Sequence, residues 1–112
     1  RRPMHELGIV AQLVEVASER AAGAHIKRLV LQIGKLSTVL PDAVRFCFDV
    51  VAEGTPCGGA VLDIVEVPGS ARCRECAAIV VLERPVGRCA CGAFDLDWLS
   101  GTEIRIVEME MR

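Results

Sequence analysis

The chain has 112 residues, of which 52% are hydrophobic, 25% are charged and 4% are aromatic, and its formal net charge is −2. This composition excludes a disordered chain and predicts one small domain, with room for a smaller lobe. The longest apolar run, Ala77 to Leu82, is too short to span a membrane, and an acidic chain with few aromatic residues disfavours nucleic-acid binding.

The first predicted element is a helix from His5 to about Ala22. Its apolar residues recur at helical spacing, and Ile9, Leu13 and Val16 widen the apolar face. We therefore expect this helix to be buried on more than one side. Gly23 is expected to end it, because glycine adopts the left-handed conformation that often follows a helix.

Strands and one further helix follow. Alternation of apolar residues predicts a strand from Ile26 to Gly34, and Pro41 opens a helix that runs to about Glu53. After a glycine-rich loop, β-branched residues predict a strand from Val61 to Val67. The last predicted strand, Glu103 to Met111, slips in its alternation near Ile106-Val107, which indicates a β-bulge or a change of neighbour.

Four of the six cysteines form two close pairs, separated by twelve residues. Thiolates at such spacing predict a tetrahedral zinc site made of Cys73, Cys76, Cys89 and Cys91. A set of disulfides is disfavoured by the paired spacing, and iron bound by four thiolates stays open as an alternative that would colour the protein red. We interpret the nearby arginines as offsetting the negative charge of the centre, and these are Arg72, Arg74, Arg84 and Arg88.

The cysteine segment lies between two predicted strands that must return to one sheet. The predicted fold is therefore α/β (α+β), a small mixed sheet with two helices plus an inserted zinc-ribbon-like lobe. We assign residues 4–69 and 101–112 to the α/β domain and residues 70–100 to the lobe. Because the lobe is small, metal ligation is expected to supply much of its folding energy.

The second group of interest is Met4-His5-Glu6 near the start of the chain. An amine on Met4, the following backbone amides and the His5 imidazole can chelate one metal in a plane, and square-planar nitrogen ligation suits Ni(II) or Cu(II). The alternative is that His5 and Glu6 simply occupy the first turn of a helix. His25, the other histidine, is interpreted as a solvated surface residue.

Taken together, these features resemble the HypA/HybF family of hydrogenase-maturation nickel metallochaperones. The resemblance covers essentially residues 4–112 and combines the Met4-His5-Glu6 opening with the late cysteine lobe. Further segments that match in order are Ile33-Gly34, residues 39–44, Phe46-Cys47-Phe48, Glu53-Gly54-Thr55, residues 60–64, residues 101–106 and Glu108-Met109-Glu110.

The resemblance implies that the chain is a nickel metallochaperone without catalytic activity. It implies that His5 is the nickel ligand, with the Met4 amine and the His5 and Glu6 amides completing the site, and that the four paired cysteines hold structural Zn(II). It further implies a nickel-handling GTPase accessory partner and the large subunit of a [NiFe]-hydrogenase as recipient. Some members serve urease, so urease accessory proteins are also expected partners.

Two positions differ from the family pattern. One residue separates Cys89 from Cys91 where two are usual, so Cys57 is kept as a reserve ligand. Arg1-Arg2-Pro3 precedes Met4, and in a chain that keeps these residues the Met4 nitrogen is an amide and the amine donor is lost.

The predicted function is nickel delivery for hydrogenase maturation, in the cytoplasm because no secretory signal is recognisable. The alternative is a zinc-ribbon protein-interaction module that transports no metal. An enzyme is disfavoured, because four protein thiolates leave zinc no open position for water. Cys47 is interpreted as a core residue of the second helix, Cys57 as more exposed, and Met109 and Met111 leave open a homodimer formed through the last strand.

Overall fold

The computed structural model describes residues 3–112, with side chains from His5 onward. The chain forms two compact units, each with its own sheet. Among the described residues, the first unit comprises 3–31, Val39–Val65 and Arg105–Arg112, and the second comprises Gln32–Thr38 and Glu66–Ile104. Among the described residues, no helix is long and apolar enough to cross a bilayer.

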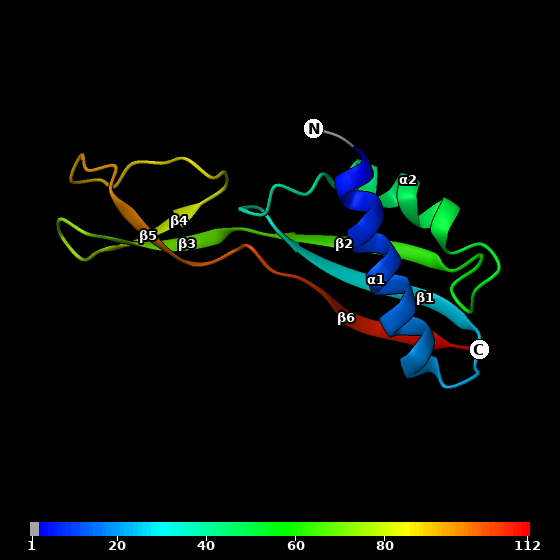
Figure 1. Ribbon diagram of the computed structural model, residues 1–112. Helices are drawn as coiled ribbons and strands as arrows, with labels where there is room; N and C mark the ends of the chain where they lie inside the picture. Colours follow the sequence, from blue (N-terminus) through cyan, green and yellow to red (C-terminus); the bar gives the residue numbers. More distant parts are fainter. Residues whose placement is uncertain (1–2) are drawn as a thin grey trace. The chain divides into compact units, whose positions relative to one another are not determined.

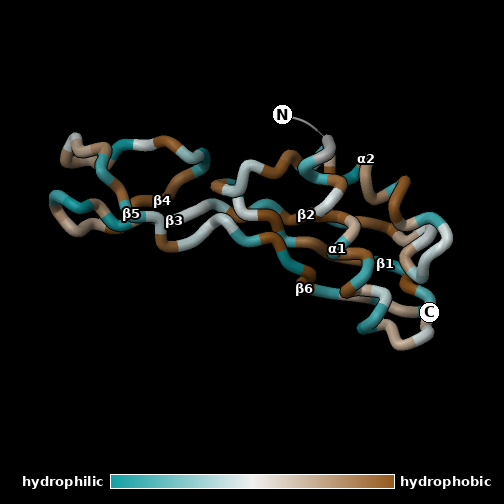
Figure 2. Tube along the Cα trace, in the orientation of Figure 1, coloured by the Kyte–Doolittle hydropathy of each residue, from teal (hydrophilic) through white to brown (hydrophobic). Residues whose placement is uncertain are grey.

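The first unit is built around strand β1 (Ile26–Gly34), as the alternation predicted. It is the middle strand of a sheet ordered β2-β1-β6, so the two strands that precede and follow the cysteine segment do return to one sheet. Leu29, Leu31 and Val30 are all buried, so β1 buries both faces, whereas the alternation of apolar residues predicts one buried face. Figure 1 shows α1 lying across this sheet beside α2, and Figure 2 shows hydrophobic stretches along α2 and the strands.

Helix α1 spans Pro3–Ala21, and the left-handed conformations of Ala22 and Gly23 follow it. Its buried apolar residues form one stripe, Val10, Val14, Ala17 and Ala21. Leu7 and Val16 remain exposed, so the prediction of burial on more than one side was wrong. A single sheet face and one neighbouring helix cover only one stripe of a helix.

Helix α2 spans Pro41–Val51 and packs against α1. Pro41 occupies the first turn, where its missing N–H costs no hydrogen bond. Val44, Cys47 and Phe48 are buried, which confirms the core role of Cys47. Leu40 precedes the helix in an extended conformation and has no side-chain cap of its own.

The outer strands of this sheet are β2 (Val61–Val67) and β6 (Ile104–Met111). In β6 the less exposed positions are Ile104, Ile106 and Met109, so the burial pattern shifts by one residue, as the slipped alternation predicted. Arg28 of β1 joins both neighbours, with Nε 2.6 Å from Asp63 Oδ2 and Nη1 2.9 Å from Glu108 Oε2.

The second unit contains a sheet ordered β4-β3-β5, from β3 (Gly69–Cys73), β4 (Ile79–Leu82) and β5 (Leu96–Ser100). Strand β3 pairs antiparallel with both neighbours, from Gly69↔Leu82 on one side to Cys73↔Leu96 on the other. Its core is small and consists of Leu36, Ala71 and Leu82 with Val80 and Leu96 packed against it. So small a core leaves much of the stabilisation of this unit to metal ligation.

Gly101 follows β5 at a close approach of three backbone segments. Its φ is 113°, in the left-handed region, and a Cβ there would overlap Gly69 Cα. Its carbonyl oxygen accepts a hydrogen bond from the Leu36 N–H at 2.9 Å. Only glycine combines this conformation with this spacing.

We expect Gly101→Ala to destabilise the second unit by at least about 2 kcal/mol, because left-handed strain and overpacking add. Urea unfolding followed by Trp98 fluorescence measures this. Gly8→Ala is the matched control, followed by helical circular dichroism, since Gly8 lies in α1 with no atom near its missing Cβ and the change should raise helix stability by roughly 0.5–1 kcal/mol. Equal effects of the two substitutions would contradict the steric argument.

Candidate metal centre

The two cysteine pairs meet at one point of the second unit. The Sγ atoms of Cys73, Cys76, Cys89 and Cys91 all lie within 4.8 Å of one another. The Sγ–Sγ distance is 3.7 Å between Cys73 and Cys91 and 3.5 Å between Cys76 and Cys89. A tetrahedron with Zn–S bonds of about 2.3 Å has sulfur atoms about 3.8 Å apart, so the arrangement fits zinc closely.

Two tight turns bring the pairs together. Cys73 ends β3, and the Ala77 N–H donates to its carbonyl oxygen at 2.9 Å, with Ala77 itself in the left-handed conformation. In the second turn, the Gly92 N–H donates to the Cys89 carbonyl oxygen at 2.8 Å, and Gly92 has φ 96°. The turn around Gly92 lets both cysteines of the short pair face the centre although only one residue separates them.

The thiols influence one another strongly. The backbone N–H groups of Cys76 and Glu75 stabilise the Cys73 thiolate and lower the pKa of Cys73 to about 7. At Cys91 the Ala93 N–H acts to lower the pKa, but the neighbouring thiols, Cys73 foremost, outweigh it together with desolvation and raise the pKa to about 12. Four thiolates therefore need a cation between them, and a divalent metal provides it.

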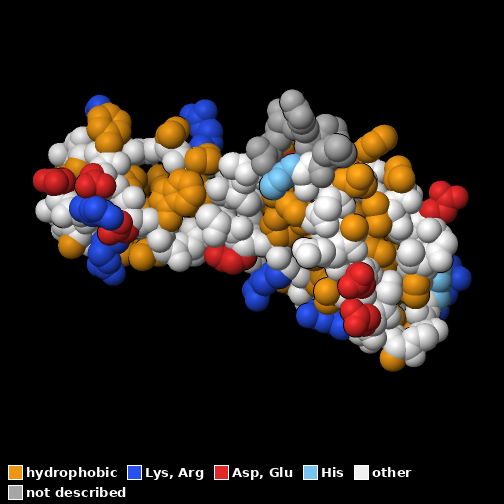
Figure 3. Space-filling view, viewed as in Figure 1, with side chains coloured by type: hydrophobic (Ala, Val, Ile, Leu, Met, Phe, Trp, Pro, Cys, Tyr) orange, Lys and Arg blue, Asp and Glu red, His pale blue; other side chains and the backbone are white. Residues whose placement is uncertain are grey.

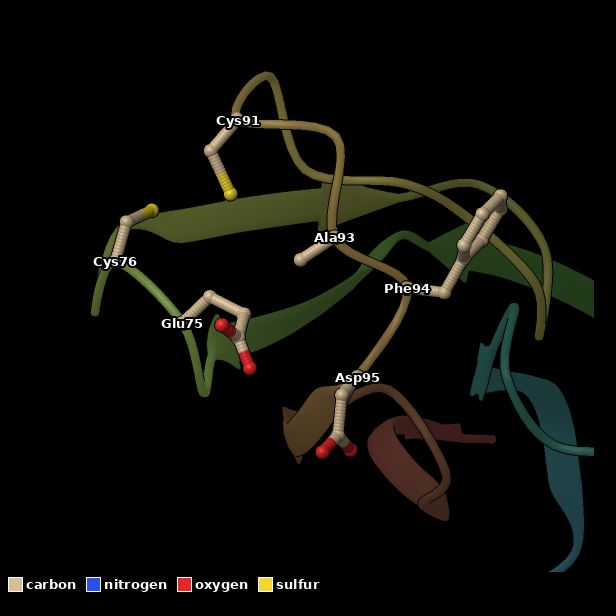
Figure 4. A pocket seen from close by; sticks show the side chains of 6 residues that line it. All are labelled: Glu75, Cys76, Cys91, Ala93, Phe94 and Asp95. Atoms are coloured by element: carbon tan, nitrogen blue, oxygen red, sulfur yellow. The ribbon is translucent and has the colours of Figure 1, made fainter.

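The donors are four sulfurs and no carboxylate. Figure 4 shows the sulfur atoms of Cys76 and Cys91 turned toward each other, while the side chains of Glu75, Asp95 and Phe94 point elsewhere. Cys73 and Cys89 are buried, whereas Cys76 and Cys91 are exposed. A closed set of four thiolates suits structural zinc, which would hold the two turns together.

Two of the arginines near the centre, Arg72 and Arg74, contact oxygen atoms and not the cysteine sulfurs. Arg74 lies between two carboxylates, with Nη2 2.6 Å from Asp97 Oδ1 and Nε 3.6 Å from Asp95 Oδ1. Arg72 donates to the Ala77 carbonyl oxygen at 3.2 Å. Within the described residues no arginine donates a hydrogen bond to a sulfur of the four clustered cysteines, so the predicted offsetting of charge is not a direct contact.

Cys57 is not part of the centre, and the prediction that it is more exposed was wrong. It is fully buried in the first unit, where burial raises the pKa of its thiol. The loop that carries it folds back onto β1, because the Ile26 N–H donates to the Pro56 carbonyl oxygen at 2.9 Å. Cys57 is a core residue and no reserve zinc ligand.

The predicted nickel ligands lie at the start of α1. His5 is exposed in the first turns of the helix, whereas Glu6 is fully buried. Glu6 Oε2 accepts a hydrogen bond from the Leu40 N–H at 3.1 Å, at the beginning of α2. Arg1, Arg2 and the Met4 side chain lie outside the part of the chain that the structure describes.

Sequence reasoning missed this role of the Glu6 side chain. The one available signal was the absence of Ser, Thr, Asp or Asn immediately before Pro41, which leaves the start of α2 in need of an acceptor from elsewhere.

The order of these features along the chain is also found in known proteins. The family model described as "Hydrogenase/urease nickel incorporation, metallochaperone, hypA" matches residues 4–111. The chain belongs to the HypA family. Because this match begins at Met4 and ends one residue before the C-terminus, it includes both the segment around His5 and the four cysteines.

Named relatives agree with this assignment. Proteins called hydrogenase maturation factor HypA from a Nostoc species and from Trichormus variabilis are 51% and 50% identical over 108 residues, which is 96% of each chain. The solution structure of the Ni metallochaperone HypA from Helicobacter pylori superposes with a TM-score of 0.69 at 28% identity, covering 95% of this chain and 96% of that one.

HypA is a nickel metallochaperone of hydrogenase maturation and not an enzyme. The predicted family, the mixed α/β fold with its cysteine lobe and the nickel-related function are thereby confirmed. A role in hydrogenase maturation also implies contact with the maturation machinery.

Proposed function

We propose that this chain binds one Ni(II) at its N-terminus through His5 and releases it for insertion into a [NiFe]-hydrogenase. Zn(II) held by Cys73, Cys76, Cys89 and Cys91 is a permanent structural ion. The observation that carries the proposal is the match to the nickel metallochaperone family over residues 4–111, which begins at Met4-His5-Glu6.

The chemistry of the two groups supports this division. Four thiolates fill the coordination shell of zinc and leave no position through which a cargo ion can be exchanged. His5, by contrast, is exposed and offers its imidazole to an incoming ion. A site that must take up and release metal gains from such access, and planar nitrogen ligation selects Ni(II) or Cu(II).

The backbone at His5 must change on nickel binding. Successive backbone nitrogens bind one ion only when they lie in a plane with it. The two nitrogens on either side of each Cα–C bond must then be nearly eclipsed when viewed along that bond. Helical dihedrals do not provide that arrangement. The first amides of a helix have no intrahelical acceptor, so unwinding the turn around His5 breaks few hydrogen bonds.

The proposed partners follow from the cargo. A GTPase accessory protein exchanges nickel with this chain, the large subunit of a [NiFe]-hydrogenase receives it, and urease accessory proteins are further partners. The family description includes both hydrogenase and urease, which supports these assignments. We place the protein in the cytoplasm, where the recipient subunit is made.

Nickel titration of the zinc-loaded protein tests the proposal, with both metals counted by elemental analysis. A chain that starts at Met4 should bind one Ni(II) while zinc stays near one per chain. The chain with Arg1-Arg2-Pro3 should bind Ni(II) at least about tenfold more weakly, because an amide replaces the amine donor. Nickel that displaces zinc, with no separate binding step, would refute the proposal.

The Glu6 side chain is proposed to hold the nickel segment rather than to bind the metal. Glu6→Gln keeps an oxygen that accepts the Leu40 N–H, so nickel affinity should stay within about twofold. Glu6→Ala leaves that N–H without its acceptor and should destabilise the first unit by about 1–3 kcal/mol. Urea unfolding followed by helical circular dichroism measures the second effect, and a large loss of nickel affinity in Glu6→Gln would assign a carboxylate ligand instead.

A further inference from the structure

The second unit has a surface pocket that is separate from the four cysteine sulfurs. Its volume is about 600 Å³, and it lies between β5 and the loop that connects β4 with β5. The residues that matter for its chemistry are Arg84, Val86, Arg88, Phe94, Leu96 and Trp98, which we call the Arg84–Trp98 pocket.

The walls of the Arg84–Trp98 pocket are apolar and exposed. Val86 is 77% exposed, Phe94 67% and Trp98 46%, although side chains of this size are normally covered. Figure 3 shows hydrophobic side chains at the surface of the part formed by β3, β4 and β5, with basic side chains beside them. Exposed aromatic residues next to arginine are typical of sites that bind another protein.

The loop that forms one wall is fixed against the core of this unit. A Cβ at Gly87 would overlap Leu82 Cδ2, so the backbone of the loop lies directly on that side chain. Leu82 is buried in the core with Leu36 and Ala71. The pocket is therefore formed before any ligand arrives, which reduces the entropy lost on binding.

The two arginines of the Arg84–Trp98 pocket are not neutralised by acidic side chains of the described residues. In residues 3–112 neither Arg84 nor Arg88 has an acidic partner, whereas Arg74 pairs with Asp97 and Lys35 with Glu83. The Arg88 guanidinium lies 4.3 Å from the centre of the Phe94 ring, so the aromatic wall orients it at the pocket. Two unpaired positive charges on an acidic protein indicate a ligand with negative charge.

We propose that the Arg84–Trp98 pocket binds an acidic peptide segment of a partner protein. An aromatic or large aliphatic side chain enters between Val86, Phe94 and Trp98, and neighbouring carboxylates pair with Arg84 and Arg88. A nucleic acid is disfavoured, because a long polyanion is repelled by the net charge of −2 of the whole chain. A short acidic segment is attracted by the local positive charge of the pocket, and salt screens its repulsion by more distant charges of the chain. Nickel binding at His5 is not required for this interaction.

Trp98 is the only tryptophan, and the chain has no tyrosine, so the tryptophan emission of the folded chain comes from a residue of this pocket. The probe is a short amidated peptide with a central Phe-Leu pair flanked by glutamates, titrated into the zinc-loaded full chain. We expect a saturable change in Trp98 emission. The same peptide with lysines in place of glutamates should bind at least about tenfold more weakly.

Charge reversal tests the two arginines. Arg84→Glu and Arg88→Glu should each weaken binding of the probe about tenfold, with zinc content unchanged. Arg105→Glu is the matched control, because Arg105 is exposed on β6 in the first unit, and it should change the affinity less than about twofold.

Three results would overturn the proposal. They are an emission that does not saturate, equal affinity for the glutamate and lysine peptides, and full binding by a variant with both arginines reversed. Stronger binding of a short single-stranded oligonucleotide than of the glutamate peptide would likewise exclude a peptide site and assign the pocket to nucleic acid.

Discussion

Replacing His5 by alanine should abolish stoichiometric Ni(II) binding while zinc stays near one per chain. The imidazole is the one strong side-chain nitrogen near the start of α1, and the Glu6 side chain is engaged with the Leu40 N–H at 3.1 Å. His5→Ala removes one of four nitrogen ligands and also the chelate ring that holds the backbone nitrogens in place. The loss of both should lower nickel affinity at least about a hundredfold. Isothermal titration with Ni(II) measures the change.

The second histidine supplies the control. His25 lies beyond the end of α1, where its carbonyl oxygen accepts the Arg112 N–H at 3.0 Å, so its contribution to the fold is made by the backbone. His25→Ala should therefore leave nickel affinity within about twofold. If His5→Ala binds nickel as tightly as the parent chain, His5 is not the cargo ligand.

Replacing Cys73 by serine should remove zinc and unfold the second unit. Serine is a poor ligand for zinc, and backbone N–H groups stabilise the Cys73 thiolate enough to lower the pKa of Cys73 to about 7. Structural zinc contributes about 10–16 kcal/mol in small zinc domains, more than a core of three buried side chains supplies. Elemental analysis should show less than about a tenth of the parent zinc content.

The two units make this outcome visible with two probes. Trp98 lies in the second unit, so its emission should shift toward that of exposed indole. Both helices lie in the first unit, so most of the helical circular dichroism should remain. Cys57→Ser is the matched control, because Cys57 is buried away from the four sulfurs and its loss should leave zinc bound. Zinc retained by Cys73→Ser would exclude Cys73 from the centre.

Local pattern predicted the first unit well and the second unit poorly. The bounds of β1 and β2 were correct because β-branched residues bordered by glycine and proline specify a strand within a few residues. In the second unit, β3 reads Gly-Ser-Ala-Arg-Cys and has no apolar alternation. Its place in the sheet depends on pairing with Leu82 and Leu96, which no local pattern reveals.

Burial was the less predictable property. Val16 looked like core from its spacing and is exposed, while Cys57 looked exposed in a glycine-rich loop and is buried. The exposure of each of these side chains depends on whether another segment of the chain packs over it. The same reason explains Glu6, whose contact with Leu40 joins residues 34 positions apart.

By itself the sequence determined the helices and strands of the first unit, the cluster of four cysteines by their spacing, and the family by the order of its motifs. Only the tertiary structure decided that residues 32–38 join the second unit, that Glu6 holds the start of α2, and that Arg88 and Phe94 form a pocket with Trp98. Spacing and periodicity act over a few residues, whereas burial and ion pairing depend on segments that only folding brings together.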